Sequence, residues 1–231
     1  MNLLSRVNAR LKEDGYSKTL KYGAIVCSDA FTTYLRDTYL DLKYSGRILH
    51  GNKKSNYKHL GANDVYHTDY SVMPLLFSNV RIKPDDILVD VGCGKGRVIN
   101  YWLSQKLPNQ IFGLEIDPSL ASATARQFSG YSNVKVIQGN AIANLPPNGT
   151  IFYFYNPFNE EKVSEFEQKV HAITGNNQVK IIYYNPKSLN VFESNKWSVK
   201  KLDFEKDFGV KRWGRLNKYH DLAIITKSML Q

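Results

Sequence analysis

From residue 87 onward, short apolar runs alternate with stretches whose apolar residues recur every three or four positions. The short runs are typical of buried strands and the periodic stretches of surface helices. Their alternation predicts a doubly wound α/β fold with a mostly parallel sheet of seven strands. The predicted strands are Ile87–Asp90, Gln110–Asp117, Val134–Gln138, Thr150–Tyr155, Val179–Tyr184, Trp197–Phe204 and Tyr219–Thr226. The predicted helices are Val98–Leu103, Ser119–Phe128, Phe158–Ala172 and a short Leu189–Ser194.

The first 60 residues have a different pattern. They are predicted to be largely helical, because Leu35, Tyr39 and Leu42 recur at the spacing of one helix face. We therefore divide the chain into a helical N-terminal extension, residues 1–60, and an α/β domain, residues 61–231. The extension is interpreted as a lid, a docking arm for the substrate, or a dimer contact; the sequence does not choose among them.

The segment between the first predicted strand and its helix carries the strongest chemical signal. Asp90 ends the strand, glycines follow at 92, 94 and 96, and Arg97 comes next. Such a turn lets a ligand press against backbone N–H groups at a helix N-terminus, which predicts a nucleotide-like cofactor. The dinucleotide fingerprint is G-x-G-x-x-G, whereas the spacing here is G-x-G-x-G. Asp90 would repel a pyrophosphate but suits a cofactor with an amino group and a sulfonium cation.

This motif resembles the D-x-G-x-G-x-G of the class I S-adenosylmethionine (SAM)-dependent methyltransferases. The resemblance covers about residues 65–227 and implies an antiparallel hairpin of the last two strands at the sheet edge. Glu115 then takes the place of the acid that binds the ribose, with Asp117 as the alternative or as a helix N-cap. Asn140 stands where the family usually has an Asp that accepts a hydrogen bond from adenine. The implied cofactor-binding residues are Asp90, Gly92, Cys93, Gly94, Gly96, Glu115, Ile116, Asn140, Ala141, Tyr155 and Asn156.

The fourth strand ends in Asn156-Pro157-Phe158, which is similar to the D/N-P-P-aromatic loop of amino-methylating members. In that loop the Asn or Asp oxygen and a backbone carbonyl accept the protons of the target amine. Only one proline is present here, so the kind of acceptor stays open. A second strand ends in Tyr184-Asn185-Pro186. The two endings predict a rim with aromatic walls, where a planar or sugar acceptor stacks.

The segment Ala62–Ser71 is expected to fold over the cofactor, as it does in the resembled class. Its candidates for closing the site are Tyr66, His67, Thr68, Asp69 and Tyr70. His67 is a candidate general base for a hydroxyl acceptor, because its ordinary pKa of about 6.5 suits proton removal near neutrality. The alternative is an ordinary loop histidine. His220-Asp221 is the poorer candidate, since it is expected at the sheet edge.

Charge suggests an anionic partner. Lys and Arg number 31 against 21 Asp and Glu, and the excess falls in residues 1–60 and 151–231. Basic and aromatic residues are interleaved around Arg47, Lys53, Lys54 and Lys58, and again in 206–215. Such mixtures suit single-stranded nucleic acid, an anionic glycan or an acidic protein face, or they are simply solvated surface.

Other features narrow the class of protein. No apolar run approaches the roughly 20 residues of a membrane span, and the start lacks the apolar core of a secretory signal. Cys27 and Cys93 are the only cysteines, so we expect reduced thiols in a cytoplasmic protein and no metal site.

The sequence thus predicts a SAM-dependent methyltransferase. A small molecule or glycan is the favoured acceptor, with an RNA or protein amine as the alternative and an acidic small molecule among the anionic options. Two other classes stay open, a non-catalytic SAM-fold protein that binds nucleic acid and an NAD(P)-dependent oxidoreductase.

Overall fold

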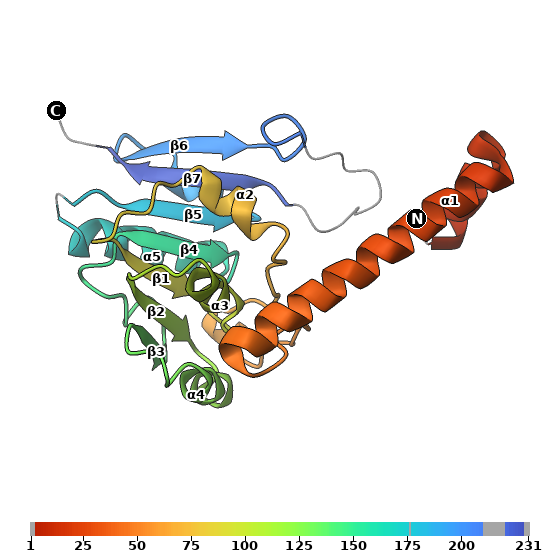
Figure 1. Cartoon of the computed structure of the whole chain (residues 1–231). Helices are drawn as coiled ribbons and strands as arrows, with labels where there is room; N and C mark the ends of the chain where they lie inside the picture. The colour runs from red at the N-terminus through yellow and green to blue at the C-terminus, as the bar shows by residue number, and fades with distance from the viewer. Residues whose placement is uncertain (1–2, 176, 210–219, 229–231) are drawn as a thin grey trace. The chain divides into compact units, whose positions relative to one another are not determined.

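The computed structural model describes residues 3–175, 177–209 and 220–228 (Figure 1). The chain divides into two compact units, residues 1–39 and residues 40–231. Helix α1 spans Leu3–Ser45 and is broken at Gly15, whose φ of 74° and ψ of 168° are not helical. Within residues 16–39 the helix exposes apolar side chains, of which Tyr16, Leu20 and Phe31 are the most exposed.

The described residues of the second unit form one seven-stranded sheet with the order β3-β2-β1-β4-β5-β7-β6 (Figure 1). The first five strands in the chain are parallel, and β7 is antiparallel to both β5 and β6. The predicted doubly wound sheet with an antiparallel hairpin is therefore confirmed. The strands are β1 Ile87–Val91, β2 Gln110–Glu115, β3 Val134–Gln138, β4 Ile151–Tyr155, β5 Lys180–Tyr184, β6 Trp197–Leu202 and β7 Leu222–Lys227.

Helices cover both faces of this sheet because neighbouring strand residues point to opposite sides. Leu88 and Tyr153 face a core shared with α2 Met73–Ser78 and α3 Arg97–Ser104. Phe152 and Phe154 face a second core, which α5 Glu160–Ile173 closes. The remaining helices are α4 Pro118–Gln127, which packs on β2 and β3, and the short 3-10 helices η1 Lys58–Leu60 and η2 Leu189–Phe192.

One sequence expectation needs correction. His220-Asp221 do not lie at the sheet edge, because they lead into β7, which lies between β5 and β6. The first 60 residues are largely helical where the structure describes them, but α1 ends at Ser45, where Gly46 takes a left-handed φ of 67°, and residues 46–57 are not helical. Of the basic and aromatic cluster 206–215, residues 210–215 lie outside the described residues.

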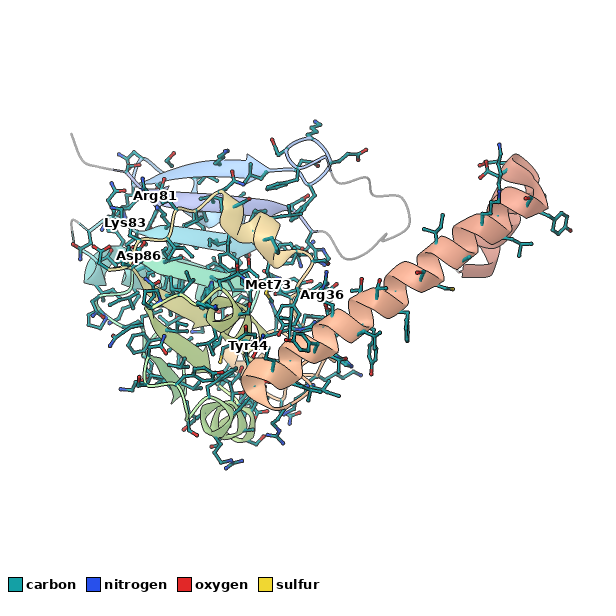
Figure 2. The ribbon with its side chains drawn as sticks, in the orientation of Figure 1. Arg36, Tyr44, Met73, Arg81, Lys83 and Asp86 are labelled. Atoms are coloured by element: carbon teal, nitrogen blue, oxygen red, sulfur yellow. The ribbon has the colours of Figure 1, made fainter. Side chains whose placement is uncertain are left out.

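The two ends of the sheet differ in their surroundings. The carboxyl ends of the strands meet the irregular segment 46–72, which we call the strap. At the amino ends lies the segment that leads into β1, with Arg81, Lys83 and Asp86 (Figure 2). Among the described residues, no helix is long and apolar enough to cross a membrane.

Candidate functional site

A groove runs across the carboxyl ends of β1, β2 and β4. Strand β1 lies between β2 and β4, so the chain leaves it in opposite directions on its two sides, which is where doubly wound folds bind ligands. The groove consists of two hollows that share Val65, Tyr66, Gly92 and Tyr155 as walls. The larger hollow has an empty volume of about 850 Å³, including its open mouth.

The glycine-rich turn between β1 and α3 forms the floor of this groove. Gly94 has a φ of +54°, and a Cβ there would lie 2.9 Å from the side chain of Val65 in the strap. A Cβ on Gly92 would lie equally close to Pro157. The glycines therefore allow the strap and the end of β4 to approach the turn closely.

The backbone N–H groups of Gly92, Cys93, Gly94 and Gly96 in this turn form hydrogen bonds within the protein. Gly92 and Cys93 both donate to the carbonyl of Leu114, and Gly96 donates to that of Cys93. The fourth amide, that of Gly94, donates to Glu115 Oε2 at 2.9 Å. The expectation that these N–H groups face the ligand is therefore wrong for these four residues. The turn contributes space rather than the nest of free donors that a pyrophosphate requires.

Two buried carboxylates flank the turn. Asp90 is 3% exposed, lines the smaller hollow and makes no hydrogen bond or ion pair to any described residue. Burial raises the pKa of Asp90 well above its ordinary value, and the nearby Glu115 raises it further. Burial also raises the pKa of Glu115, which the amides of Asp117 and Gly94 oppose. Both carboxyl groups would gain from a cation in the groove.

The far end of the groove is more polar. Asp117 caps α4 by accepting hydrogen bonds from the amides of Ser119 and Leu120, as the N-cap alternative predicted. Burial alone would raise its pKa, but the ammonium of Lys53 at 2.5 Å and the Ser119 hydroxyl hold the pKa at about 2. Asn140 lines the same hollow, and its Oδ1 accepts from the amides of Ile142 and Ala143. Its oxygen is thus engaged, whereas Nδ2 makes no hydrogen bond to a described residue.

The strap forms the outer wall of the groove and is fixed at several points. Thr68 shares a 2.6 Å hydrogen bond with the Tyr153 hydroxyl, and Lys95 of the glycine turn donates to the carbonyl of His50 at 2.8 Å. Lys53 reaches Asp117, as described above. Asn63 is bonded to the chain after β4 through both its backbone and its side chain. The strap thus places Tyr66, His67 and Thr68 along the groove.

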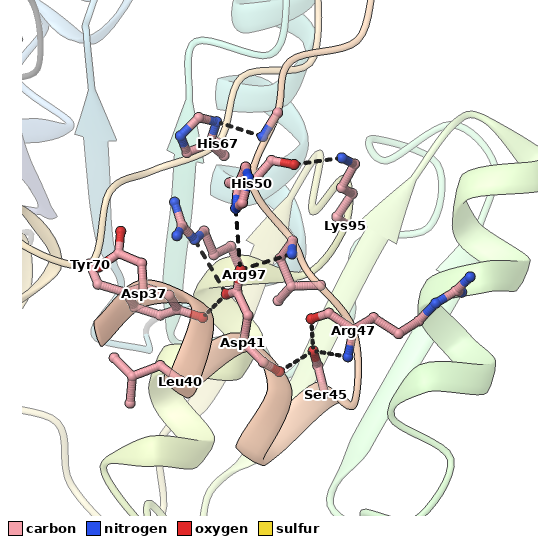
Figure 3. A network of polar contacts seen from close by, with 12 residues as sticks. Asp37, Leu40, Asp41, Ser45, Arg47, His50, His67, Tyr70, Lys95 and Arg97 are labelled. Atoms are coloured by element: carbon pink, nitrogen blue, oxygen red, sulfur yellow. Dashed lines mark hydrogen bonds and ion pairs between the residues drawn. The ribbon is translucent and has the colours of Figure 1, made fainter. Parts of the chain in front are cut away.

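A buried ionic network supports the strap from below (Figure 3). Asp41, in the last turns of α1, accepts hydrogen bonds from the Tyr70 hydroxyl and the Leu49 amide. Arg97, which is 4% exposed, lies 3.5 Å from Asp41 and 3.7 Å from Asp69, with its guanidinium over the Tyr70 ring. The charge of Arg97 is therefore compensated by these two acids and not by Asp90.

His67 is held on both sides of its ring. Nδ1 lies 3.3 Å from the amide of Gly51 (Figure 3). Nε2 lies 3.4 Å from the carboxylate of Asp69. Nδ1 also lies 3.2 Å from Asn52 Oδ1, so which ring nitrogen carries the proton depends on the tautomer. The catalytic role of His67 stays a prediction.

A separate cleft opens beside the groove, on the other side of Tyr66 and Tyr155, whose rings are 6.2 Å apart. Four asparagines line it, and we call it the amide cleft. Its other described walls include Lys58 and Asp64, which form an ion pair at 3.0 Å. The four asparagines are Asn63, Asn156, Asn159 and Asn185.

The predicted aromatic rim is only partly assembled. Tyr155 and Tyr184 are paired across β4 and β5, but Tyr184 is buried behind Tyr155 against His220. Phe158 lines the groove instead of the amide cleft. Pro157 also lines the groove, whereas Asn156 lies in the cleft.

The segment Ala62–Ser71 was expected to cover the site, but Asn63 and Val65 within it were not singled out as wall residues, and Lys53 was noted only for its charge. Their places in the wall depend on contacts with residues distant in the sequence. No group of three or more His, Cys, Asp or Glu residues that could hold a metal ion occurs in the described ranges.

Comparison with known proteins gives the fold but no family by sequence. No protein-family model and no curated protein match the chain. Among solved structures, it is similar to a methyltransferase from Pyrococcus furiosus, with a TM-score of 0.57 and 16% identity over 88% of this chain and 100% of that one. It is also similar to the StiE O-MT, with a TM-score of 0.54 and 12% identity over 70% of this chain and 74% of that one.

A third similar structure is a putative caffeoyl-CoA O-methyltransferase from Staphylococcus aureus, with a TM-score of 0.52 and 12% identity over 71% of this chain and 86% of that one. At these identities the likeness concerns the fold. The chain has the Rossmann-like fold of class I SAM-dependent methyltransferases.

Proposed function

We propose that this protein is a SAM-dependent methyltransferase. The observation that carries the proposal is the pair of buried carboxylates, Asp90 and Glu115, in one groove with no compensating cation among the described residues. SAM brings an ammonium and a sulfonium, which are the charges that such a groove favours. A dinucleotide would instead bring a pyrophosphate to a turn whose amides of residues 92, 93, 94 and 96 are already engaged.

The groove residues fit the two halves of SAM. Asp90 suits the amino group, and the free lone pairs of Glu115 suit the ribose hydroxyls. Asn140 would meet the adenine through Nδ2 as a donor, since its oxygen is engaged. Gly92, Cys93, Gly94, Gly96, Ile116, Ala141 and Tyr155 are proposed to complete the cofactor site.

When bound, SAM supplies a methyl group on a positively charged sulfur, which is already activated for transfer. The residues of the chain then have to bind, orient and keep water away, and no acid–base pair is required. The acceptor is proposed to enter from the amide cleft, because that cleft adjoins the groove at Tyr66 and Tyr155. A small molecule or glycan suits its amide lining better than a polyanion does, because Lys58 is already paired with Asp64.

A ligand-stabilisation experiment tests the cofactor. The melting temperature of the protein is measured with SAM, with S-adenosylhomocysteine (SAH) and with NADH. At a hundredfold excess over Kd, a ligand adds about 2.7 kcal/mol to the free energy of unfolding. We expect SAM and SAH to stabilise the protein and NADH to have no effect. Stabilisation by NADH alone would identify an oxidoreductase and contradict the proposal.

Transfer is tested with labelled SAM and fractionated cell extract. Label in one extract fraction supports an enzyme and shows where the acceptor is. Binding of SAM without any incorporation, together with tight binding of RNA, would point to a non-catalytic nucleic-acid-binding protein instead.

A further inference from the structure

The backbone oxygen atoms of the Asn-Pro-Phe turn, residues 156–158, each accept a hydrogen bond from Asn63. Asn63 donates through Nδ2 to the carbonyls of Asn156 and Phe158, at 2.9 and 2.8 Å. The backbone amide of Asn63 donates to the carbonyl of Pro157 at 2.8 Å. Each of these three carbonyls therefore already accepts a hydrogen bond within the protein, which leaves it one lone pair at most for an amine.

The side-chain oxygen of Asn156 is engaged as well. The Tyr183 hydroxyl lies 3.0 Å from Asn156 Oδ1 and also accepts a hydrogen bond from the Ser188 amide at 3.3 Å. In this arrangement the Tyr183 hydroxyl donates its proton to Asn156 Oδ1, while its oxygen accepts from Ser188. Burial raises the pKa of Tyr183, which keeps this proton in place at neutral pH.

These contacts fix the orientation of the Asn156 amide. With Oδ1 held by Tyr183, Nδ2 is the polar atom that remains, and it makes no hydrogen bond to any residue in the described parts of the chain. Asn156 lines the amide cleft beside Tyr66, a residue that is 52% exposed. The turn therefore presents a hydrogen-bond donor next to an aromatic face.

We propose that this cleft takes a hydroxyl-bearing ring, a phenol or a sugar, whose oxygen accepts from Asn156 Nδ2 and whose face packs on Tyr66. This inference rests on the proposed function and adds the substrate class, an oxygen acceptor rather than an amine. The donor stabilises negative charge as it develops on the oxygen. In the reaction a carbon–oxygen bond forms and the carbon–sulfur bond breaks with its electron pair on sulfur. The hydroxyl proton passes to water at the open mouth of the cleft.

Matched ring probes test the polarity of the cleft without turnover. The ¹⁵N-labelled full chain, loaded with SAH, is titrated at millimolar concentration with catechol, with methyl glucopyranoside and with ortho-phenylenediamine. The side-chain NH₂ signals of Asn156 are identified by their absence in Asn156→Asp. We expect catechol or the glucoside to shift these signals and the diamine to leave them unchanged. Whichever of the two hydroxyl probes binds more tightly shows whether the cleft prefers a phenol or a sugar.

Three variants sharpen the test. Asn156→Asp replaces the donor by an acceptor, so the preferred hydroxyl probe should bind about tenfold more weakly. Tyr183→Phe frees Asn156 Oδ1 and should reduce the preference for hydroxyl over amine probes. Asn148→Asp is the matched control, because Asn148 lies exposed before the amino end of β4.

Two outcomes overturn the inference. One is a shift of the Asn156 signals by the diamine and not by either hydroxyl probe, and the other is no shift by any probe. The labelled product from extract shows independently whether the methyl group is on oxygen or nitrogen. Hydriodic acid releases O-methyl groups much more readily than N-methyl groups. Label on nitrogen contradicts the inference but leaves the proposed methyltransferase intact. Failure of SAH to bind contradicts the proposed function, and the probes then test the cleft in the unliganded chain.

Discussion

The two ends of the sheet differ in whether their buried polar side chains have hydrogen-bond partners. At the amino ends, Asn109 Nδ2 donates to the carbonyls of Lys83 and Asp86, both at 2.7 Å, and the Thr150 hydroxyl donates to Asp86. Each polar group there has a partner close by. At the carboxyl ends, Asp90 is buried without a hydrogen bond or counter-ion in the described residues, and its neighbour Glu115 is also an acid. The first arrangement stabilises the fold, whereas the second leaves charge for a ligand to neutralise.

The largest effect on stability is expected at the amino end. Asn109→Ala removes a buried side chain that donates to part-buried carbonyls and should lower the free energy of unfolding by about 1–3 kcal/mol. The affinity for SAM should stay unchanged, because the proposed site lies at the other end of the strands. Denaturant unfolding and calorimetric titration measure the two quantities. Asn190→Ala is the control, since Asn190 is exposed and its side chain is bonded only to Glu160 among the described residues.

At the carboxyl end, replacing a buried polar side chain should have the opposite effects: stability should rise and SAM affinity should fall. Asp90→Asn removes a buried charge, so the unliganded protein should become more stable at neutral pH, while SAM binding should weaken by roughly 10–100-fold. Melting curves and titration calorimetry with SAM measure both effects. Asp85→Asn, an exposed site before the amino end of β1, should change neither. A variant of Asp90 that is less stable and binds SAM normally would remove the distinction between the two ends.

The pH dependence of stability sharpens the comparison further. Because burial raises the pKa of Asp90, the folded state binds its proton more tightly than the unfolded chain does. The favourable contribution of Asp90 is then complete below its unfolded pKa of about 3.9 and is lost as pH rises through its higher folded pKa. The stability gained by Asp90→Asn should therefore increase with pH. Paired unfolding midpoints of the wild type and the variant, taken from acidic to slightly alkaline pH, follow this difference.

The smallest effect is expected for the ion pair that fixes the strap. The Lys53 side chain is 41% exposed, so Lys53→Met should cost at most about 1 kcal/mol of stability. Its effect on SAM binding should be only a few-fold and should become smaller at high salt, because salt screens the wild-type pair. A large loss of stability in this variant would mean that the strap is held mainly at Lys53 rather than by Asn63 and Thr68.

Local pattern was enough to predict the sheet and its acids. Asp90 and Glu115 stand at the ends of short apolar runs, and the strand before a glycine turn is recognisable without any distant contact. His220-Asp221 were predicted at the sheet edge, whereas β7 lies between β5 and β6. The sequence could not show this, because edge and interior strands have similar short apolar runs. The resemblance supplied the hairpin but not the contacts of the residues before it.

The remaining features depend on contacts between distant residues. Asn63 reaches the carbonyls after β4 from more than 90 positions away, and the Asn156 amide is oriented by Tyr183 of a neighbouring strand. An Asn-Pro-aromatic ending has the same sequence whether its oxygens are free or engaged. The polarity of the turn could therefore be obtained only from the structure. The cofactor and catalytic roles of individual residues stay predictions.

Calorimetric titration of SAM into the wild type and Asp90→Asn, in buffers of different ionisation enthalpy, tests the uncompensated carboxylates most directly. At mildly acidic pH a cation entering the groove should displace a proton from the Asp90–Glu115 pair. We predict net proton release on binding in the wild type and less release, with weaker binding, in the variant. Equal affinity and equal proton release in both proteins would show that Asp90 does not hold the donor.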